Sequence, residues 1–161
     1  MPNRSPAETD SRFEEEYSRH WLAVFRFAVG WTNDWAAAED IAQEAFARLW
    51  AHRARIDWSA SNLPWLLTTA RHITTDRFRR LRRLAGLTFS AGRSAPPDDD
   101  ARVRWIDLQA AMSRLPRDQR AALVLTGVVG LDSDSAAQVL GTTPGGVRAA
   151  ASRARQALAE Q

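Results

Sequence analysis

The sequence predicts an all-α protein made of two small helical domains that are joined by a flexible linker. Apolar residues recur at steps of three and four along several segments, which is the pattern of amphipathic helices. Glycine (8) and proline (7) are sparse among the 161 residues and cluster outside those segments. Because 45% of the residues are hydrophobic, the chain can bury a packed core, and this argues against global disorder.

The composition also excludes several chemistries. Cysteine is absent, which rules out disulfides, thiolate metal sites and cysteine nucleophiles. His20, His52 and His72 are scattered, and neither a catalytic triad spacing nor a glycine-rich phosphate loop occurs. We therefore expect no catalytic site, no metal, no cofactor and no small-molecule substrate, so the protein is not expected to be an enzyme. With no apolar run near the roughly 18 residues of a membrane span and no signal peptide, a cytoplasmic protein without membrane contact is expected.

Residues 11–85 are expected to form the first domain, with three helices. The first helix covers residues 11–30 and carries one aromatic and aliphatic stripe. The second is the clearest, because Asp34 offers an N-cap and apolar residues repeat without a gap from Trp35 to Trp50. The opposite face of that second helix is acidic and polar, with Glu39, Asp40, Gln43 and Glu44.

Three interpretations of this acidic face are open from the residues alone. Solvated charge is the commonest reason for such a face, and a docking surface for a basic partner comes second. Metal binding is a distant third, because no histidine converges on the carboxylates.

A loop at residues 55–62 separates the second helix from the third. It contains Trp58, and an exposed loop aromatic can stack on an unpaired base. Partial burial of this ring against a neighbouring helix is an equal alternative. The third helix is expected from about Leu63 to about Leu84.

The third helix is apolar at its start and densely cationic at its end. Residues 71–83 contain six arginines and one aspartate. Such a helix docks on protein at one end and faces a polyanion at the other, and nucleic acid is the natural candidate. Solvated charge that complements the helix dipole is the alternative. On a helix, four polar residues of the run share one broad face: Arg71, Thr75, Arg79 and Arg82.

Residues 86–100 show no period and are expected to form the linker. Glycines, prolines and the cluster Asp98–Asp100 mark this stretch. Fully extended, such a segment spans roughly 50 Å. The second domain is then expected over residues 101–161.

The second domain contains the outline of a helix-turn-helix. A helix over about 101–114 and an apolar stretch that ends at Gly130 come first. Asp132 and Ser133 cap a short helix that Gly141 ends, and Thr143 caps the last helix. In a helix-turn-helix the second helix of the pair enters the major groove.

The last helix, which runs to about Ala159, has two faces. Val147, Ala151, Ala154 and Leu158 fall on an apolar face, while Arg148, Ser152 and Arg155 fall on another, with Arg153 and Gln156 beside them. A helix that reads the major groove needs an apolar face that packs on its own domain and a polar face that points to the DNA. An ordinary amphipathic helix in a small bundle would show it equally well.

Three motifs in this order and spacing resemble the extracytoplasmic-function class of bacterial RNA polymerase sigma factors. The stretch Ala38–Trp50 is similar to region 2.2. Pro64–His72, with Asp76 and Arg79–Arg80 after it, is similar to regions 2.3 and 2.4. Region 4.2 is matched by Leu115–Pro116, Gly130–Leu131, Ala137, Gly145, Val147 and Arg153–Arg155. The resemblance covers about residues 11–84 and 103–159.

The resemblance implies a sigma factor that binds core RNA polymerase and directs promoter-specific initiation. The acidic face, Glu39, Asp40, Gln43 and Glu44, would dock on the clamp coiled coil of the largest polymerase subunit. The −10 element would be recognised and melted by Trp58, Ser61, Asn62, Arg71, His72, Thr75, Arg79, Arg80, Arg82 and Arg83. The −35 duplex would be read by Thr143, Gly145, Arg148, Ser152, Arg153 and Arg155. The partners implied are core RNA polymerase and promoter DNA, and the class often has an anti-sigma factor.

Three positions depart from the family pattern. His72 stands where asparagine is usual, Ser135 where glutamate is usual, and Ala150 where a basic residue is common. Two rival functions remain open at this point. One is a free-standing helix-turn-helix regulator, which would gain nothing from the acidic face. The other is a sigma-like protein that only sequesters a partner.

Overall fold

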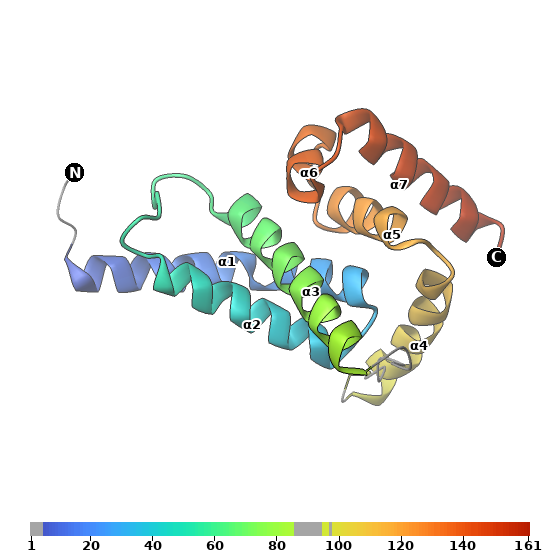
Figure 1. Ribbon diagram of the computed structural model, residues 1–161, viewed down its shortest axis with the longest axis horizontal. Coiled ribbons are helices and arrows are strands. Elements are labelled where there is room, and N and C mark those ends of the chain that lie inside the picture. Colours follow the sequence, from blue (N-terminus) through green and yellow to red (C-terminus); the bar gives the residue numbers. More distant parts are fainter. Residues whose placement is uncertain (1–4, 86–94, 97) are drawn as a thin grey trace.

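The computed structural model describes residues 5–85, 95–96 and 98–161, and this part of the chain is helical without strands (Figure 1). The expectation of an all-α fold is confirmed. The elements are α1 (Pro6–Thr32), α2 (Trp35–Ala51), α3 (Leu63–Ala85), α4 (Asp99–Ser113), α5 (Arg117–Leu123), the short π-helix η1 (Val124–Val128), α6 (Ser133–Leu140) and α7 (Pro144–Ala159).

Helices α1, α2 and α3 form the N-terminal bundle. The chain turns from α1 to α2 at Asn33, which has a left-handed backbone with φ 53°. Asp34 then caps α2 by accepting a hydrogen bond from the backbone N–H of Ala37 at 3.1 Å. The core of this bundle includes Phe27, Ile41, Phe46, Leu66 and Ile73, all fully buried.

Helices α4, α5, α6 and α7, with η1, form the C-terminal half. Asp132 caps α6 through the N–H of Ser135 at 2.7 Å, and Gly141 ends α6 with φ 65°. Thr143 caps α7 through the N–H of Gly146 at 3.0 Å. The helix-turn-helix and its caps are therefore confirmed.

The two halves pack directly against each other, which the sequence did not predict. Helix α6 lies against α3, and α5 and η1 lie against α1. Asn33 and Gln109 exchange buried hydrogen bonds between side-chain amide and backbone carbonyl, at 3.1 and 2.6 Å. Arg120 donates to the carbonyls of Gly30 at 2.9 Å and Trp31 at 3.2 Å, at the end of α1. One apolar cluster runs through both halves.

The end of the predicted linker is helical. Asp98 caps α4 through the N–H of Asp100 at 3.2 Å, and Asp99 and Asp100 lie in its first turn. Acidic residues there complement the helix dipole, which gives this cluster a local structural role. Residues 86–94 and 97 of the linker lie outside the described part of the chain. Among the described helices, none combines the length and the hydropathy needed to cross a bilayer.

Candidate polymerase-docking and nucleic-acid surfaces

The acidic face of α2 is exposed, but its last carboxylate is already paired. Glu39, Asp40 and Gln43 are exposed, whereas Glu44 is half-buried. Arg77 of α3 lies with one nitrogen 3.2 Å from Glu44 Oε2 and another 3.9 Å from Asp40 Oδ2.

Glu44 has a second cationic neighbour on its own helix. Arg48 donates to Glu44 Oε1 at 2.9 Å, so two arginines hold this carboxylate. One arginine of the cationic run, Arg77, therefore points back to α2 rather than outward. Sequence reasoning missed this, because no local pattern marks which arginine of a run turns toward its own domain.

The loop between α2 and α3 corrects the prediction for Trp58. Its ring is 7% exposed, and its indole N–H donates to the carbonyl of Arg53 at 3.1 Å. The expectation of an exposed aromatic that stacks on a base is therefore wrong in this structure, and the alternative of burial holds. Asn62 is also buried, and its side-chain amide donates to the carbonyls of Asp57 and Ala60 at 3.3 and 3.4 Å.

Two buried polar residues of α1 hold this loop, and sequence reasoning missed both. Glu16 accepts a hydrogen bond from the backbone N–H of Asn62, and His20 lies next to Ser61. Burial lowers the pKa of His20 below its ordinary value; the Glu16 carboxylate opposes this shift and Arg19 adds to it. A polar residue on a predicted apolar stripe was the available signal.

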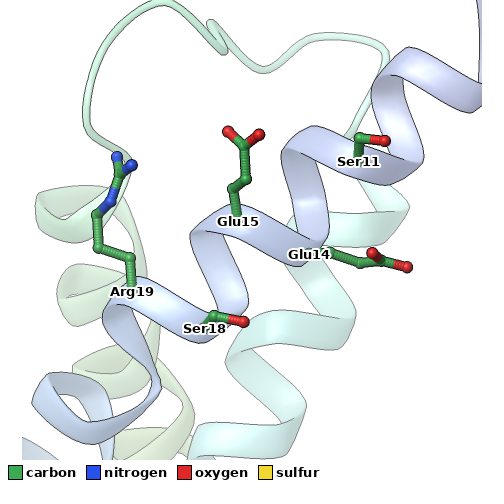
Figure 2. Close-up of a pocket in the computed structure, with 5 residues that line it drawn as sticks. All are labelled: Ser11, Glu14, Glu15, Ser18 and Arg19. Carbon is green, nitrogen blue, oxygen red and sulfur yellow. The ribbon is translucent and has the colours of Figure 1, made fainter.

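The outer surface of α1 near this region carries a shallow, open hollow. Its lining residues are Ser11, Glu14, Glu15, Ser18 and Arg19 (Figure 2). Figure 2 shows Glu15 and Arg19 standing on the same side of the helix. The lining mixes both signs of charge, with two carboxylates and one guanidinium.

The cationic end of α3 is mostly exposed. His72 and the arginines from position 79 onward are open to solvent, and Arg82 stacks over Phe78 at 4.8 Å from the ring centroid. Thr75 is half-buried and donates its hydroxyl to the carbonyl of Arg71 at 2.9 Å. The predicted −10 contacts that are exposed here are Ser61, His72, Arg79, Arg80, Arg82 and Arg83.

Arg71 is the second predicted −10 residue with a contact that the sequence did not predict, because it faces the other half of the protein. Its guanidinium lies against the turn of the helix-turn-helix, with a nitrogen 3.6 Å from where a Cβ on Gly141 would stand. Its Nε is buried without a hydrogen-bond partner, and Nη2 lies 3.2 Å from His72 Nε2. Arg71 is half-buried in this arrangement, and its contact with DNA remains a prediction.

Helix α7 has the two faces that the sequence predicts. Val147, Ala151 and Ala154 are buried against the C-terminal half. The predicted −35 contacts are all exposed: Thr143, Gly145, Arg148, Ser152, Arg153 and Arg155. Their contact with DNA remains a prediction. In the described ranges, no three histidine, aspartate or glutamate side chains lie together as metal ligands.

Comparisons with known proteins match both halves of the chain. Residues 17–84 match the Sigma-70 region 2 family, and residues 105–158 match Sigma-70, region 4. The chain is 34% identical over 139 residues to the ECF RNA polymerase sigma factor SigC of Mycobacterium tuberculosis, covering 84% of this chain and 75% of that protein. It is 30% identical over 153 residues to the RNA polymerase sigma factor CarQ of Myxococcus xanthus, covering 92% and 87%.

A solved structure extends the similarity to the packing of the two halves. The sigma factor RpoE of Bartonella quintana, in complex with the anti-sigma factor NepR, superimposes with a TM-score of 0.80 at 26% identity, covering 92% of this chain and 94% of that one. The region 2 match contains the acidic face of α2, the α2–α3 loop and the arginine end of α3. The region 4 match contains the exposed arginines of α7. The chain therefore belongs to the extracytoplasmic-function class of RNA polymerase sigma factors, which bind core RNA polymerase and promoter DNA and direct promoter-specific initiation of transcription.

Proposed function

We propose that three separate surfaces divide the work of this sigma factor. The acidic face of α2 docks on core polymerase, the arginine end of α3 with the preceding loop holds and opens the −10 element, and α7 reads the −35 duplex. The observation that carries this proposal is the separation of charge, with exposed acids on α2 and exposed arginines on α3 and α7. We further infer that its role is non-catalytic and that it acts in the cytoplasm, together with the polymerase.

The docking surface is best defined by the exposed residues of this face, which include Asp40 although Arg77 lies 3.9 Å from its carboxylate. Because Glu44 is held by two arginines of its own chain, a basic partner is expected to engage mainly Glu39, Asp40 and Gln43. Exposed charges attract a complementary surface and also raise the rate of encounter.

The −10 surface needs both a grip on the backbone and a place for an unstacked base. Unpairing a base costs a few kcal/mol, so the free energy must come from contacts made to the open strand. Arginines on phosphates supply sequence-independent affinity, which is the role we assign to Arg79, Arg80, Arg82 and Arg83. The exposed part of the α2–α3 loop, Ser59–Ser61, is then the segment nearest to a captured base.

Binding both promoter elements requires the two halves to separate. The elements lie about two helical turns apart, on the order of 70 Å. In this structure α6 instead packs on α3, and Arg71 touches the turn at Gly141. Since the related Bartonella quintana protein adopts a similar arrangement in its anti-sigma complex, we include an anti-sigma factor among the proposed partners.

The docking assignment is tested by the double variant Asp40→Ala with Gln43→Ala. We expect weaker binding to core polymerase and unchanged binding to an isolated −35 duplex, both measured by fluorescence anisotropy. The matched control is Glu14→Ala with Ser18→Ala, which removes one exposed acid and one exposed polar side chain from α1. Equal loss of core binding in both double variants would refute the assignment to α2.

A further inference from the structure

Glu16 and His20 are buried on a helix whose neighbouring residues are exposed. Glu16 is 6% exposed and His20 is 7% exposed, although Glu15, Ser18 and Arg19 around them are open to solvent. The two are one turn apart on the same face of α1. A buried carboxylate is costly unless hydrogen bonds satisfy it, so a specific arrangement is expected around Glu16.

Both side chains contact the junction between the α2–α3 loop and α3. Glu16 Oε2 accepts from the backbone N–H of Asn62 at 3.2 Å. His20 Nε2 lies 3.4 Å from that same oxygen and 3.4 Å from Ser61 Oγ. Asn62 directly precedes α3, and its carbonyl accepts the first hydrogen bond of that helix from the N–H of Leu66 at 2.9 Å.

Further hydrogen bonds fold the loop onto itself. Trp58 bonds the carbonyl of Arg53, Asn62 bonds those of Asp57 and Ala60, and Asp57 accepts from Ser59 at 2.9 Å. These bonds give the loop its shape but do not fix its position against α1. The contacts from Glu16 and His20, together with the buried ring of Trp58, hold the loop on the bundle.

We propose that Glu16 and His20 are positioning residues that set the place of the loop against the −10 strand. The proposal rests on the proposed function, in which exposed loop residues Ser59–Ser61 lie beside a captured base. Glu16 and His20 are buried, so they act through Asn62 and Ser61 and do not touch DNA themselves. Positioned groups tolerate little displacement, and a shift of about 1 Å can cost on the order of 100-fold in rate.

Two substitutions of Glu16 are expected to affect the hydrogen bond to Asn62 differently. Glu16→Ala leaves the Asn62 N–H without an acceptor and removes the neighbour of His20. Glu16→Gln keeps a carbonyl oxygen at the same reach, so the bond to Asn62 persists without the charge. A matched control is Ile41→Val, which trims a 1% exposed side chain of the same core on α2 and removes no hydrogen bond of the loop.

The test uses holoenzyme on a promoter library with randomised −10 and −35 positions, followed by sequencing of the transcripts. We expect Glu16→Ala to lower enrichment at the −10 positions about tenfold or more, because the loop is displaced from its position beside the captured base. Enrichment at the −35 positions and binding to core polymerase should not change. Glu16→Gln should restore most of the −10 preference, and Ile41→Val should retain it.

Wild-type −10 preference in the Glu16→Ala holoenzyme would overturn the proposal, as would equal loss in Ile41→Val. If Glu16→Ala does not fold by circular dichroism, His20→Asn replaces it, because the shorter side chain falls short of Ser61. Retention of full −10 preference by that variant would likewise overturn the proposal. If holoenzyme with the wild-type protein enriches no −10 sequence, the proposed function is refuted, and the inference that rests on it is refuted as well.

Discussion

Gly30 lies where α1 meets η1, and the close approach there gives a quantitative test of how the two halves pack. A Cβ built on Gly30 would stand 2.5 Å from Val124 Cγ2 and 3.1 Å from its Cβ. Val124 is 5% exposed, and its branched side chain has little freedom to rotate away. Gly30→Ala therefore forces a shift at the contact between the N-terminal bundle and the C-terminal half.

The expected magnitude combines two opposing effects. Overpacking a close contact costs about 1–3 kcal/mol. Alanine in place of glycine inside a helix contributes roughly 1 kcal/mol of stability. The net expectation for Gly30→Ala is a loss of about 1 kcal/mol, or a fall in Tm of about 2–4 °C for a chain of this size. In a Val124→Ala background the 2.5 Å contact with Cγ2 is gone and the 3.1 Å approach to Cβ remains, so the same change should lie between neutral and a gain of roughly 1 kcal/mol.

A double-mutant cycle measured by urea unfolding reports how much the cost of Gly30→Ala falls when Cγ2 of Val124 is removed. Because one apolar cluster runs through both halves, we expect a single unfolding transition for each variant. The predicted coupling free energy between the two positions is about 1–2 kcal/mol, within the range for residues in contact. A Gly30→Ala effect that is the same in both backgrounds would refute direct contact between α1 and η1 in solution.

Three further predictions concern charge. Arg79→Ala with Arg82→Ala should weaken promoter binding and lower the slope of log K against log salt by about one unit per lost phosphate contact; an unchanged slope would count against such contacts. Arg148→Ala should weaken −35 duplex binding by about 1–3 kcal/mol in titrations at fixed salt, whereas substitution of the N-capping Asp132 should act on stability instead. Burial lowers the pKa of His20 in the folded protein, so the unfolded chain binds more protons in the pH range between the two pKa values. The stability that neutral His20 allows is therefore fully present above the unfolded pKa. The free energy of unfolding falls as the pH falls through the unfolded pKa toward the folded pKa. Between pH 7.5 and 5.5 the free energy of unfolding measured in urea should therefore decline less for His20→Gln than for the wild type. An equal decline in the two proteins would contradict this.

The local features of the fold could be predicted because their causes are local. Asp34, Asp132 and Thr143 each cap a helix that begins at the next residue, and a cap needs only its own side chain and the first turn. The buried and exposed faces of α7 follow from the same logic, since helical spacing alone assigns Val147 and Arg148 to different faces.

The features that could not be predicted depend on contacts between distant segments. Asn33 and Gln109 are 76 residues apart, and neither carries a pattern that announces the other. The burial of Trp58 and the inward turn of Arg77 depend in the same way on where neighbouring elements lie. Arg71 has the right residue type and spacing for DNA contact, yet tertiary packing places it against the turn at Gly141.

The most direct test of the account is transcription in vitro with core RNA polymerase from the bacterium that encodes this chain. Core enzyme is incubated with and without the purified protein on a library of promoter fragments, and the run-off transcripts are sequenced. If the protein directs promoter-specific initiation, we predict transcripts that depend on the protein and share a −10 and a −35 element upstream of their start. Transcripts with no common upstream element, or a yield that the protein does not change, would contradict its central claim.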